Sequence, residues 1–322
     1  MKAMVYHEYG LPDVLRLEEV AKPAPGDNEV LIKVVAASIN DWDWQLLQGI
    51  PFANRMMAGL FRPKKIKILG SDIAGRIEAA GKNAKRFRPG DEVFGDLSGA
   101  GFGGFAEYVC APEDALTLKP VGMTFEQAAA VPQAGLLALQ GLVKGHVQQA
   151  HTVLINGASG GAGSFAVQIA KSVGAEVTGV CRTQKLDFVR SLGADHVIDY
   201  TREDFTRNGQ TYDLILDMEA YHSVFDYRRA LNAGGRYVAA GGPTANIVQV
   251  IFLGAWISLT SSKKMGLLLL KANRGLSEII KLIENGEVKP VIDKCFPLGE
   301  APDAMRYFGE GRKMGKVVIT LE

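Results

Sequence analysis

A glycine-rich turn between residues 157 and 163 is the segment whose residue types and spacing point most directly to chemistry. The apolar run 153–155 precedes it and is typical of a buried parallel strand. After the turn, apolar residues recur every three or four positions, which predicts a helix. Glycine lets the backbone approach a ligand closely, and the free N–H groups of a first helical turn attract an anion. The segment therefore predicts a pyrophosphate site.

The spacing of this turn places glycine at 157, 160 and 163, which differs from the commoner pattern G-x-G-x-x-G. Glycines alone indicate little, so the prediction depends on the strand before them and the helix after them. The residues expected to contact the pyrophosphate are Gly157, Ser159, Gly160, Gly161, Ala162 and Gly163. The alternative is a tight strand–helix turn that binds nothing.

An alternation of strands and helices continues beyond the turn and argues against that alternative. Strands are expected over 176–181, 196–200, 214–218 and 236–240, and helices over 184–192 and 223–233. Repeated βα units of this kind predict an α/β fold with a doubly wound parallel sheet and right-handed crossovers.

The end of the second expected strand indicates which dinucleotide this sheet binds. An NAD site usually has Asp or Glu there, which binds the ribose 2′-hydroxyl. The sequence instead has Cys181, Arg182 and Thr183, with Lys185 close behind. Arg182 and Lys185 can pair with a 2′-phosphate, and Thr183 can donate a hydrogen bond to it. NADPH is therefore the expected cofactor, and the alternative is that these charges are solvated and the specificity is loose.

Composition excludes several other classes of function. The chain has 322 residues, of which 47% are hydrophobic and 22% charged, and its formal net charge is +1. A charge so close to zero gives no general affinity for nucleic acid or for an anionic membrane. The composition is that of a globular enzyme, and the length is sufficient for two domains of ordinary size.

The three cysteines, Cys110, Cys181 and Cys295, are far apart and form no C-x-x-C pair. This argues against a disulfide scaffold and a structural zinc site, and favours a reducing compartment. The first residues lack the apolar core of a targeting peptide, so a cytoplasmic location is expected. The apolar stretches 247–259 and 265–270 fall short of the roughly 20 residues that a transmembrane helix needs. They are expected to be core or a subunit contact.

The chain outside the βα region is rich in short strands. Val30, Ile32 and Val34 alternate with other residues as a half-buried strand would, and the tail returns to strand patterns over 291–296 and 316–321. Residues 50–68 are expected to be an irregular loop ending in a basic run, 62–67, that is either solvated or a phosphate site. We therefore expect residues 1–122 with 265–322 to form one domain and 123–264 to form the cofactor-binding domain.

This order of parts resembles the medium-chain dehydrogenase/reductase superfamily, and in particular its zinc-free branch of quinone oxidoreductases (zeta-crystallin type) and enone reductases. The motifs that carry the resemblance are Ala37–Asp43, Leu69–Gly75, Arg88–Val93, Gly104–Tyr108, Ala128–Pro132, the glycine turn, Arg190–Tyr200 and Met314–Val318. The resemblance implies a GroES-like β-rich catalytic domain plus a Rossmann dinucleotide-binding domain.

The resemblance also argues against a metal. Zinc enzymes of this superfamily hold the ion with a Cys, a His-Glu pair and a later Cys or His. Here Asn40 occupies the place of the first Cys, and Ser71-Asp72 replaces the His-Glu pair. An amide and a hydroxyl do not make a tight zinc site, so no metal is expected.

The resemblance implies further contacts with the cofactor. Tyr200 matches a tyrosine that reaches the 2′-phosphate, while Pro132, Gly135, Gly241 and Gly242 lie near the nicotinamide. Asn40 is the candidate catalytic residue, because it can hydrogen-bond the substrate carbonyl or the nicotinamide ribose. The alternative role for Asn40 is to cap the helix that follows it.

The expected activity is NADPH-dependent reduction of a small electrophile, either a quinone or the C=C bond of an α,β-unsaturated carbonyl. One alternative is an enoyl-thioester reductase, in which the basic run 62–67 would hold a CoA phosphate. Another is an NADPH-binding regulatory or structural protein without turnover. The apolar stretch 247–259 is either core or the interface of a homodimer, which the family suggests.

Overall fold

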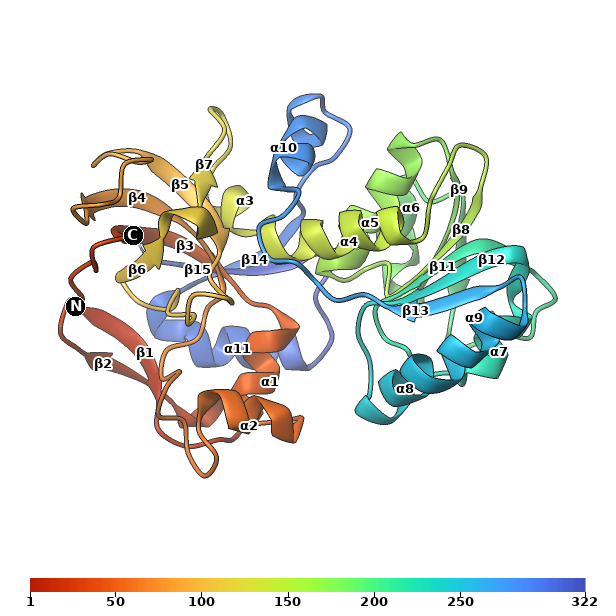
Figure 1. The fold of residues 1–322 in the computed structure, drawn as a ribbon, viewed down its shortest axis with the longest axis horizontal. Coiled ribbons are helices and arrows are strands. Elements are labelled where there is room, and N and C mark those ends of the chain that lie inside the picture. The colour runs from red at the N-terminus through yellow and green to blue at the C-terminus, as the bar shows by residue number, and fades with distance from the viewer. Residues whose placement is uncertain (322) are drawn as a thin grey trace. The chain divides into compact units, whose positions relative to one another are not determined.

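The computed structural model describes residues 1–321, and their contacts group them into two compact units. Unit 1 consists of Met1–Gln133, Ala272–Leu276 and the chain from Pro290 onward. Unit 2 consists of Ala134–Lys271 and Ser277–Lys289. Figure 1 labels the elements of both units.

These limits differ from the predicted divisions at 122/123 and 264/265. Two hydrogen bonds from side chains of unit 2 explain why the segments that end at Lys271 and at Lys289 group with it. Gln140 Nε2 donates to the Lys271 carbonyl at 2.8 Å, and Gln168 Nε2 donates to the Lys289 carbonyl at 3.1 Å. The two segments are therefore tied to unit 2 by bonds between residues about 120 to 130 positions apart.

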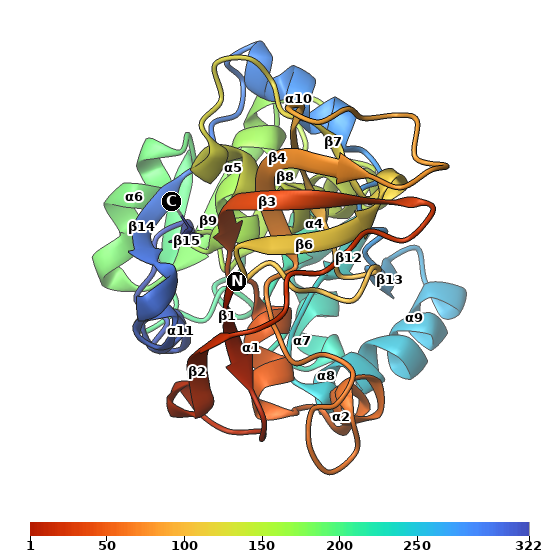
Figure 2. The same cartoon turned by 90° about the vertical axis from the view of Figure 1, so that its left-hand side faces the viewer.

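Unit 1 is built on a seven-stranded sheet with the order β14-β15-β3-β4-β5-β7, in which β6 also pairs with β3. The strands are β3 (Glu29–Ser38), β4 (Asp72–Ala80), β5 (Glu92–Asp96), β6 (Tyr108–Pro112), β7 (Thr117–Leu118), β14 (Ile292–Pro297) and β15 (Lys316–Thr320). β6 and β15 share one edge of β3, because β6 pairs with residues 29–33 and β15 with residues 36–38. Figure 2 shows β4 and β6 on either side of β3.

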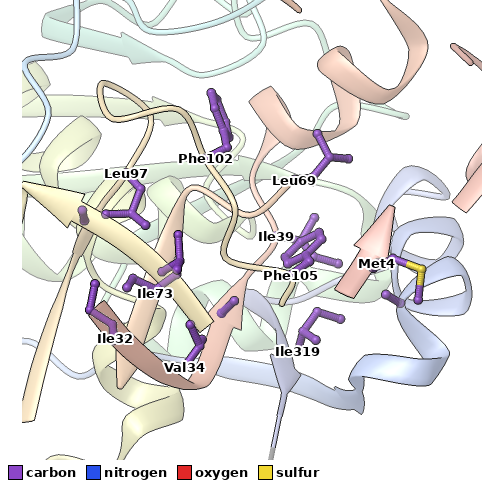
Figure 3. Packing of buried hydrophobic residues seen from close by; sticks show 14 of the residues in the cluster. Met4, Ile32, Val34, Ile39, Leu69, Ile73, Leu97, Phe102, Phe105 and Ile319 are labelled. Atoms are coloured by element: carbon purple, nitrogen blue, oxygen red, sulfur yellow. The ribbon is translucent and has the colours of Figure 1, made fainter. Parts of the chain in front are cut away.

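The remaining elements of unit 1 are short. A second sheet pairs β1 (Lys2–Tyr6) with β2 (Leu15–Glu19). The helices are α1 (Asp41–Gln48), α2 (Phe52–Ala58), α3 (Phe125–Ala129) and α11 (Ala301–Gly309), with single turns η1 (Pro12–Val14), η2 (Glu113–Ala115) and η5 (Leu298–Glu300). The buried core that they enclose takes side chains from both ends of the chain, including Met4, Ile32, Ile73, Phe105 and Ile319 (Figure 3).

Helix α2 corrects the expectation of an irregular loop over 50–68. Two side-chain bonds to the preceding backbone stabilise it, from Asn54 Nδ2 to the Ile50 carbonyl at 2.9 Å and from Arg55 Nε to the Gly49 carbonyl at 3.1 Å. Many of its apolar residues, such as Phe52 and Met56, are exposed. The helix therefore has no buried apolar stripe of the kind that a helical period normally marks. Periodicity therefore could not predict this helix.

Unit 2 contains the expected parallel sheet, with strand order β10-β9-β8-β11-β12-β13. The strands are β8 (Thr152–Asn156), β9 (Glu176–Cys181), β10 (His196–Asp199), β11 (Tyr212–Asp217), β12 (Leu231–Ala239) and β13 (Lys264–Leu267). The helices and turns are α4 (Pro132–Lys144), α5 (Gly161–Ser172), η3 (Thr183–Lys185), α6 (Leu186–Ser191), α7 (Val224–Arg229), α8 (Thr244–Gln249), the π-helical turn η4 (Val250–Gly254), α9 (Ala255–Thr260) and α10 (Leu276–Glu284).

Two details of unit 2 differ from the sequence prediction. The helix expected over 223–233 ends at Arg229, because Leu231 already pairs with Tyr212 as the first residue of β12. The edge strand β13 was not predicted, since it has only four residues and its place is set by pairing with β12.

Gly75 on β4 is a position where the sheet of unit 1 tolerates no side chain. A Cβ there would overlap the Lys33 carbonyl oxygen and approach Ile32 Cγ2 to 2.9 Å. We expect Gly75→Ala to lower the free energy of unfolding by about 1–3 kcal/mol, because backbone of a paired strand cannot move aside. Gly99→Ala is the control, since a Cβ at Gly99 meets nothing within 4 Å. Urea unfolding followed by tryptophan fluorescence measures both, and equal midpoints would contradict the expectation.

Candidate active site and cofactor site

The strand order of unit 2 identifies where a ligand would bind. Numbered in chain order, it is the 3-2-1-4-5-6 arrangement of dinucleotide-binding sheets, and β8 and β11 flank the point where the order reverses. Ligands bind such sheets beyond the carboxyl ends of the strands at this point. Here β8 ends at Asn156 and β11 at Asp217, and Asn156 Nδ2 donates to Asp217 Oδ1 at 2.8 Å. This bond holds the two strand ends together.

The predicted glycine turn lies directly after β8. Gly157 has a φ of +81°, a conformation that favours glycine, and the Gly160 N–H donates to the Gly157 carbonyl at 3.0 Å. The first helical bond of α5 runs from the Ser164 N–H to the Gly160 carbonyl at 2.9 Å. The N–H groups of Gly161, Ala162 and Gly163 precede it, so they have no partner within the helix.

Gly163 lets the first turn of α5 approach this strand end. A Cβ at position 163 would overlap the Gly157 carbonyl oxygen, and one at Gly157 would approach Met218 Cβ to 3.2 Å. Ser159, in the middle of the turn, is buried. The turn therefore has N–H groups without helical partners and the close backbone packing that a dinucleotide pyrophosphate requires.

The residues predicted to bind a 2′-phosphate gather where β9 and β10 end. Arg182 Nε donates to the Tyr200 hydroxyl at 2.5 Å, and Thr183 begins the turn η3, which Lys185 completes. Strand pairing explains this, because β9 and β10 are parallel neighbours and Asp199 lies opposite Cys181. The two segments are separated in the sequence, yet they meet at one edge of the sheet.

Asp199 is an acid at this place that the sequence reasoning missed. The Thr183 hydroxyl donates to Asp199 Oδ2, and Thr201 donates to Asp199 Oδ1 through its N–H and its hydroxyl, at 3.0 and 2.7 Å. These bonds hold the pKa of Asp199 below its usual value, so it is ionised but internally satisfied. The Thr183 hydroxyl therefore bonds to Asp199 in the structure, and its bond to a ligand stays a prediction. The parallel pairing of two expected strands could have revealed Asp199.

The other predicted cofactor residues lie after the end of β12 and at the start of α4. Gly241 and Gly242 follow β12, and a Cβ on either would approach the carbonyl of Met218 or of Glu219 to 2.6 Å. Pro132 begins α4, and Gly135 is buried one turn into that helix. The structure brings Gly241 and Gly242 against the end of β11.

In unit 1, four strand ends place polar residues in one buried cluster. Ser38 on β3 lies opposite Asp72 on β4, which lies opposite Asp96 on β5. Beside this row, Lys316 begins β15. We call Ser38, Asn40, Ser71, Asp72 and Lys316 the Lys316 cluster, and all five side chains are buried.

Asn40, the predicted catalytic residue, is at the centre of this cluster. Its Nδ2 donates to Ser71 Oγ at 3.0 Å, and its Oδ1 accepts from Lys316 Nζ at 2.5 Å. Asn40 is also the N-cap of α1, and its backbone N–H donates to Asp43 Oδ2 at 2.9 Å. The capping role and a place in the polar cluster therefore coexist.

Lys316 and Asp72 are the charged members of the cluster, and the sequence reasoning selected neither as a site residue. Lys316 Nζ also donates to the Ile39 carbonyl at 3.2 Å and lies 3.8 Å from Asp72 Oδ2. Asp72 further accepts from the Ser38 hydroxyl at 3.3 Å and from the Gln133 N–H at 3.1 Å. A lysine directly before the apolar run 317–319 is the signal that could have pointed to a buried cation.

Burial dominates the titration of this region. It raises the pKa of Asp43 to about 7, although Asp43 accepts backbone N–H bonds from Asn40 and Gly70 that oppose the shift. Burial likewise raises the pKa of Asp72 and of Asp96 and lowers that of Lys316. Asp96 Oδ2 is buried without a hydrogen-bond partner.

The chain resembles known proteins both in sequence and in structure. Residues 26–121 match the family of alcohol dehydrogenase GroES-like domains, and residues 192–319 match the family of zinc-binding dehydrogenases. The chloroplastic quinone-oxidoreductase QR1 of Triphysaria versicolor is 34% identical, over 99% of this chain and 98% of its own length. The chloroplastic NADPH-dependent alkenal/one oxidoreductase of Arabidopsis thaliana is 35% identical, over 99% of this chain and 79% of its own.

The solved structure of the quinone oxidoreductase from Coxiella burnetii has the same fold, with a TM-score of 0.88 and 31% identity over 100% of this chain and 99% of that one. The chain belongs to the quinone oxidoreductase and enone reductase branch of the medium-chain dehydrogenase/reductase superfamily. It is an oxidoreductase with a GroES-like domain and a Rossmann domain, and the predictions of family and fold class are confirmed.

Two features of this oxidoreductase bear on metals and membranes. Within residues 1–321, His, Cys, Asp and Glu side chains nowhere form a group of three or more that could hold a metal ion. Over the same residues, none of the helices combines the length and the apolar character that a bilayer crossing requires.

The raised pKa of Asp43 predicts how the stability of the oxidoreductase depends on pH. The folded chain holds this proton more tightly than the unfolded chain, so the Asp43 contribution falls as pH rises from about 4 to about 7. We expect Asp43→Asn, which does not titrate, to be less stable than the wild type at pH 5, and this difference should shrink by up to roughly 1.4 kcal/mol per pH unit towards pH 7. Urea unfolding at pH 5, 6, 7 and 8 measures it. A difference that stays constant or grows would contradict the assignment.

Proposed function

We propose that this oxidoreductase uses NADPH to reduce quinones or the C=C bond of α,β-unsaturated carbonyl compounds. The observation that carries the proposal is the pairing of Arg182 with Tyr200 beside the strand end that lacks the usual acid. The names of the relatives support it, since one is a quinone oxidoreductase and another an NADPH-dependent alkenal/one oxidoreductase. These activities are named for the relatives, and we infer the same chemistry for this chain.

Three sets of residues would hold the cofactor. The N–H groups of Gly161, Ala162 and Gly163, with Gly157, Ser159 and Gly160, would bind the pyrophosphate. Arg182, Lys185 and Tyr200, with Thr183, would bind the 2′-phosphate, because guanidinium and ammonium groups pair strongly with phosphate. Pro132, Gly135, Gly241 and Gly242 would contact the nicotinamide end. These assignments use the geometry of each strand end together with the family resemblance.

Bound NADPH would supply a hydride to the electron-poor β-carbon of an enone, or two electrons to a quinone. Negative charge then accumulates on the carbonyl oxygen of the acceptor, where a hydrogen-bond donor lowers the barrier. Asn40 would be that donor through Nδ2, and solvent would supply the proton to the α-carbon.

We propose that the reaction is independent of zinc. At the places where zinc enzymes of the superfamily have Cys and His, Asn40 and Ser71 hydrogen-bond to each other at 3.0 Å. Neither an amide nor a hydroxyl is a good zinc ligand.

A homodimer is also proposed, with Phe252, Trp256 and Leu259 at the interface, because these large apolar side chains are exposed on neighbouring turns. The cytoplasmic location stays a prediction.

The proposal predicts which substrates are turned over. NADPH oxidation should be measured with a short-chain enone, an ortho-quinone and an enoyl-CoA, each repeated with NADH. We expect turnover of the enone or the quinone with NADPH and much less with NADH. Turnover of enoyl-CoA alone would favour an enoyl-thioester reductase. Tight NADPH binding without turnover of any acceptor would favour a binding protein.

Arg182 should decide the preference for NADPH. Arg182→Ala removes a charge-assisted bond, so we expect the KM for NADPH to rise about 10–100-fold while the KM for NADH stays within about twofold. Arg190→Ala is the matched control, because Arg190 is an exposed arginine on α6 that pairs with Asp187 at 2.7 Å. Equal effects of Arg182→Ala on both cofactors would refute the 2′-phosphate site.

A further inference from the structure

Helix α2 and the loop after it carry large apolar side chains that face solvent. Figures 1 and 2 show this helix and loop at the lower rim of unit 1. The exposed large apolar residues, all within 12 positions of the chain, are Ile50, Phe52, Met56, Met57, Leu60 and Phe61. Single exposed apolar side chains are common on proteins, but a group of them usually marks an interaction site.

The backbone holds the loop after α2 in place. The N–H groups of Lys64 and Lys65 both donate to the Ala58 carbonyl, at 2.8 and 2.9 Å, so the loop returns to the end of the helix. Ile66 is buried in the core of unit 1 and anchors the far side of the loop. Phe61 lies between these two fixed points with 89% of its surface exposed. Its exposure is therefore a property of the fold.

The same segment carries a local excess of positive charge. Residues 44–71 contain five basic residues and neither Asp nor Glu. Four of the five follow Phe61 closely and are exposed, and among residues 1–321 none of these four forms an ion pair: Arg62, Lys64, Lys65 and Lys67. The net charge of +1 for the whole chain conceals this excess, because a charge acts over only about 8 Å at physiological ionic strength. We call these four residues and the six exposed apolar ones the α2 surface.

The exposed apolar surface of α8 and α9 differs from the α2 surface in its charge. Residues 244–260 expose Phe252, Trp256 and Leu259 but contain no charged residue. Such a surface suits a second copy of the chain, because the centres of protein interfaces are poor in charge. Two copies that met through the α2 surface would instead bring unpaired cations together. The α2 surface therefore matches a partner that is both apolar and anionic.

We propose that the α2 surface docks on an anionic lipid bilayer. Phe61 and its apolar neighbours would enter the boundary between headgroups and acyl chains, and the four basic side chains would lie against the anionic headgroups. Each basic residue close to such a membrane contributes about fivefold in affinity. Docking of this kind uses only the surface of unit 1, so it does not depend on the proposed cofactor or acceptor.

Flotation of the full chain with lipid vesicles measures the docking. One set of vesicles contains phosphatidylcholine alone, and the other contains phosphatidylserine as well. We expect binding to the anionic vesicles to be at least about tenfold tighter and to weaken as salt is added. A wild type that leaves the anionic vesicles unbound would overturn the proposal. Equal binding to both sets would overturn it too, because the unpaired cations would then play no part.

A pair of double variants tests the charge of the α2 surface. Lys64→Gln with Lys65→Gln should weaken binding to anionic vesicles about 10–30-fold. Lys281→Gln with Lys289→Gln removes the same net charge from exposed positions of unit 2, and we expect less than about a twofold change. Equal losses in the two double variants would show that the net charge and not this surface binds the membrane.

Phe61→Ser tests the apolar part of the α2 surface. Because Phe61 is so exposed, we expect the midpoint of urea unfolding to stay the same and vesicle binding to weaken about 5–10-fold. Val121→Ser is the control, since Val121 is a fully exposed apolar residue elsewhere in unit 1. Vesicle binding that Phe61→Ser leaves unchanged, or that Val121→Ser lowers as much, would overturn the insertion of this side chain.

Two other occupants of the α2 surface would give different results. Coenzyme A that binds the wild type but not Lys64→Gln with Lys65→Gln, in the absence of vesicle binding, would assign the basic run to a free phosphate. A sedimentation coefficient that falls in Phe61→Ser would assign the surface to a second copy. Either result would overturn the docking.

Vesicle binding requires no turnover, so this inference and the proposed function fail separately. A wild type that binds anionic vesicles but reduces no acceptor would refute the proposed function and support the docking. A wild type that reduces an enone or a quinone but binds no vesicles would overturn the docking alone.

Discussion

The pairing of β15 with β3 is the contact on which unit 1 depends. It joins Val318 to Ser38 and so brings the end of the chain into a sheet that the first third of the chain begins. Without β15, the buried cluster around Asn40 would lose its only cation within the described residues. The same pairing closes the core shown in Figure 3, since Ile319 packs there with Ile32 and Phe105. A backbone contact over some 280 residues thus supports both packing and chemistry.

Unit 1 buries several charged side chains close together. Asp72 and Asp96 face each other across neighbouring strands, an arrangement that disfavours two ionised carboxylates. One ammonium, from Lys316, balances part of this charge. The cluster therefore holds its groups in fixed orientations and in low dielectric, where a hydrogen bond to a developing charge is stronger than in water. This is the physical basis for the proposal that Asn40 acts as a donor without a metal ion.

In unit 2, backbone N–H groups without helical partners lie next to the end of a strand. Gly157 supplies the left-handed turn, and Gly163 removes the side chain that would keep α5 away from it. The hydrogen bond from Asn156 to Asp217 holds the neighbouring strand ends where the strand order reverses. The residues proposed to set cofactor specificity, Arg182 and Tyr200, meet at the edge of the sheet because β9 and β10 are parallel neighbours.

The sequence by itself determined the class of fold, the glycine turn and the βα order of unit 2, because each depends on local patterns of glycine, charge and apolar period. Asn40 became a candidate through the family resemblance. The resemblance also placed Arg182 and Tyr200 together. Only the tertiary structure decided that Asp199 accepts a hydrogen bond from the Thr183 hydroxyl and that Lys316 donates to Asn40 Oδ1. Both depend on which strands pair and in which register, and periodicity within one segment carries no information on that. For the same reason α2 and β13 escaped prediction, since a short helix with exposed apolar residues and a four-residue edge strand depend on their surroundings.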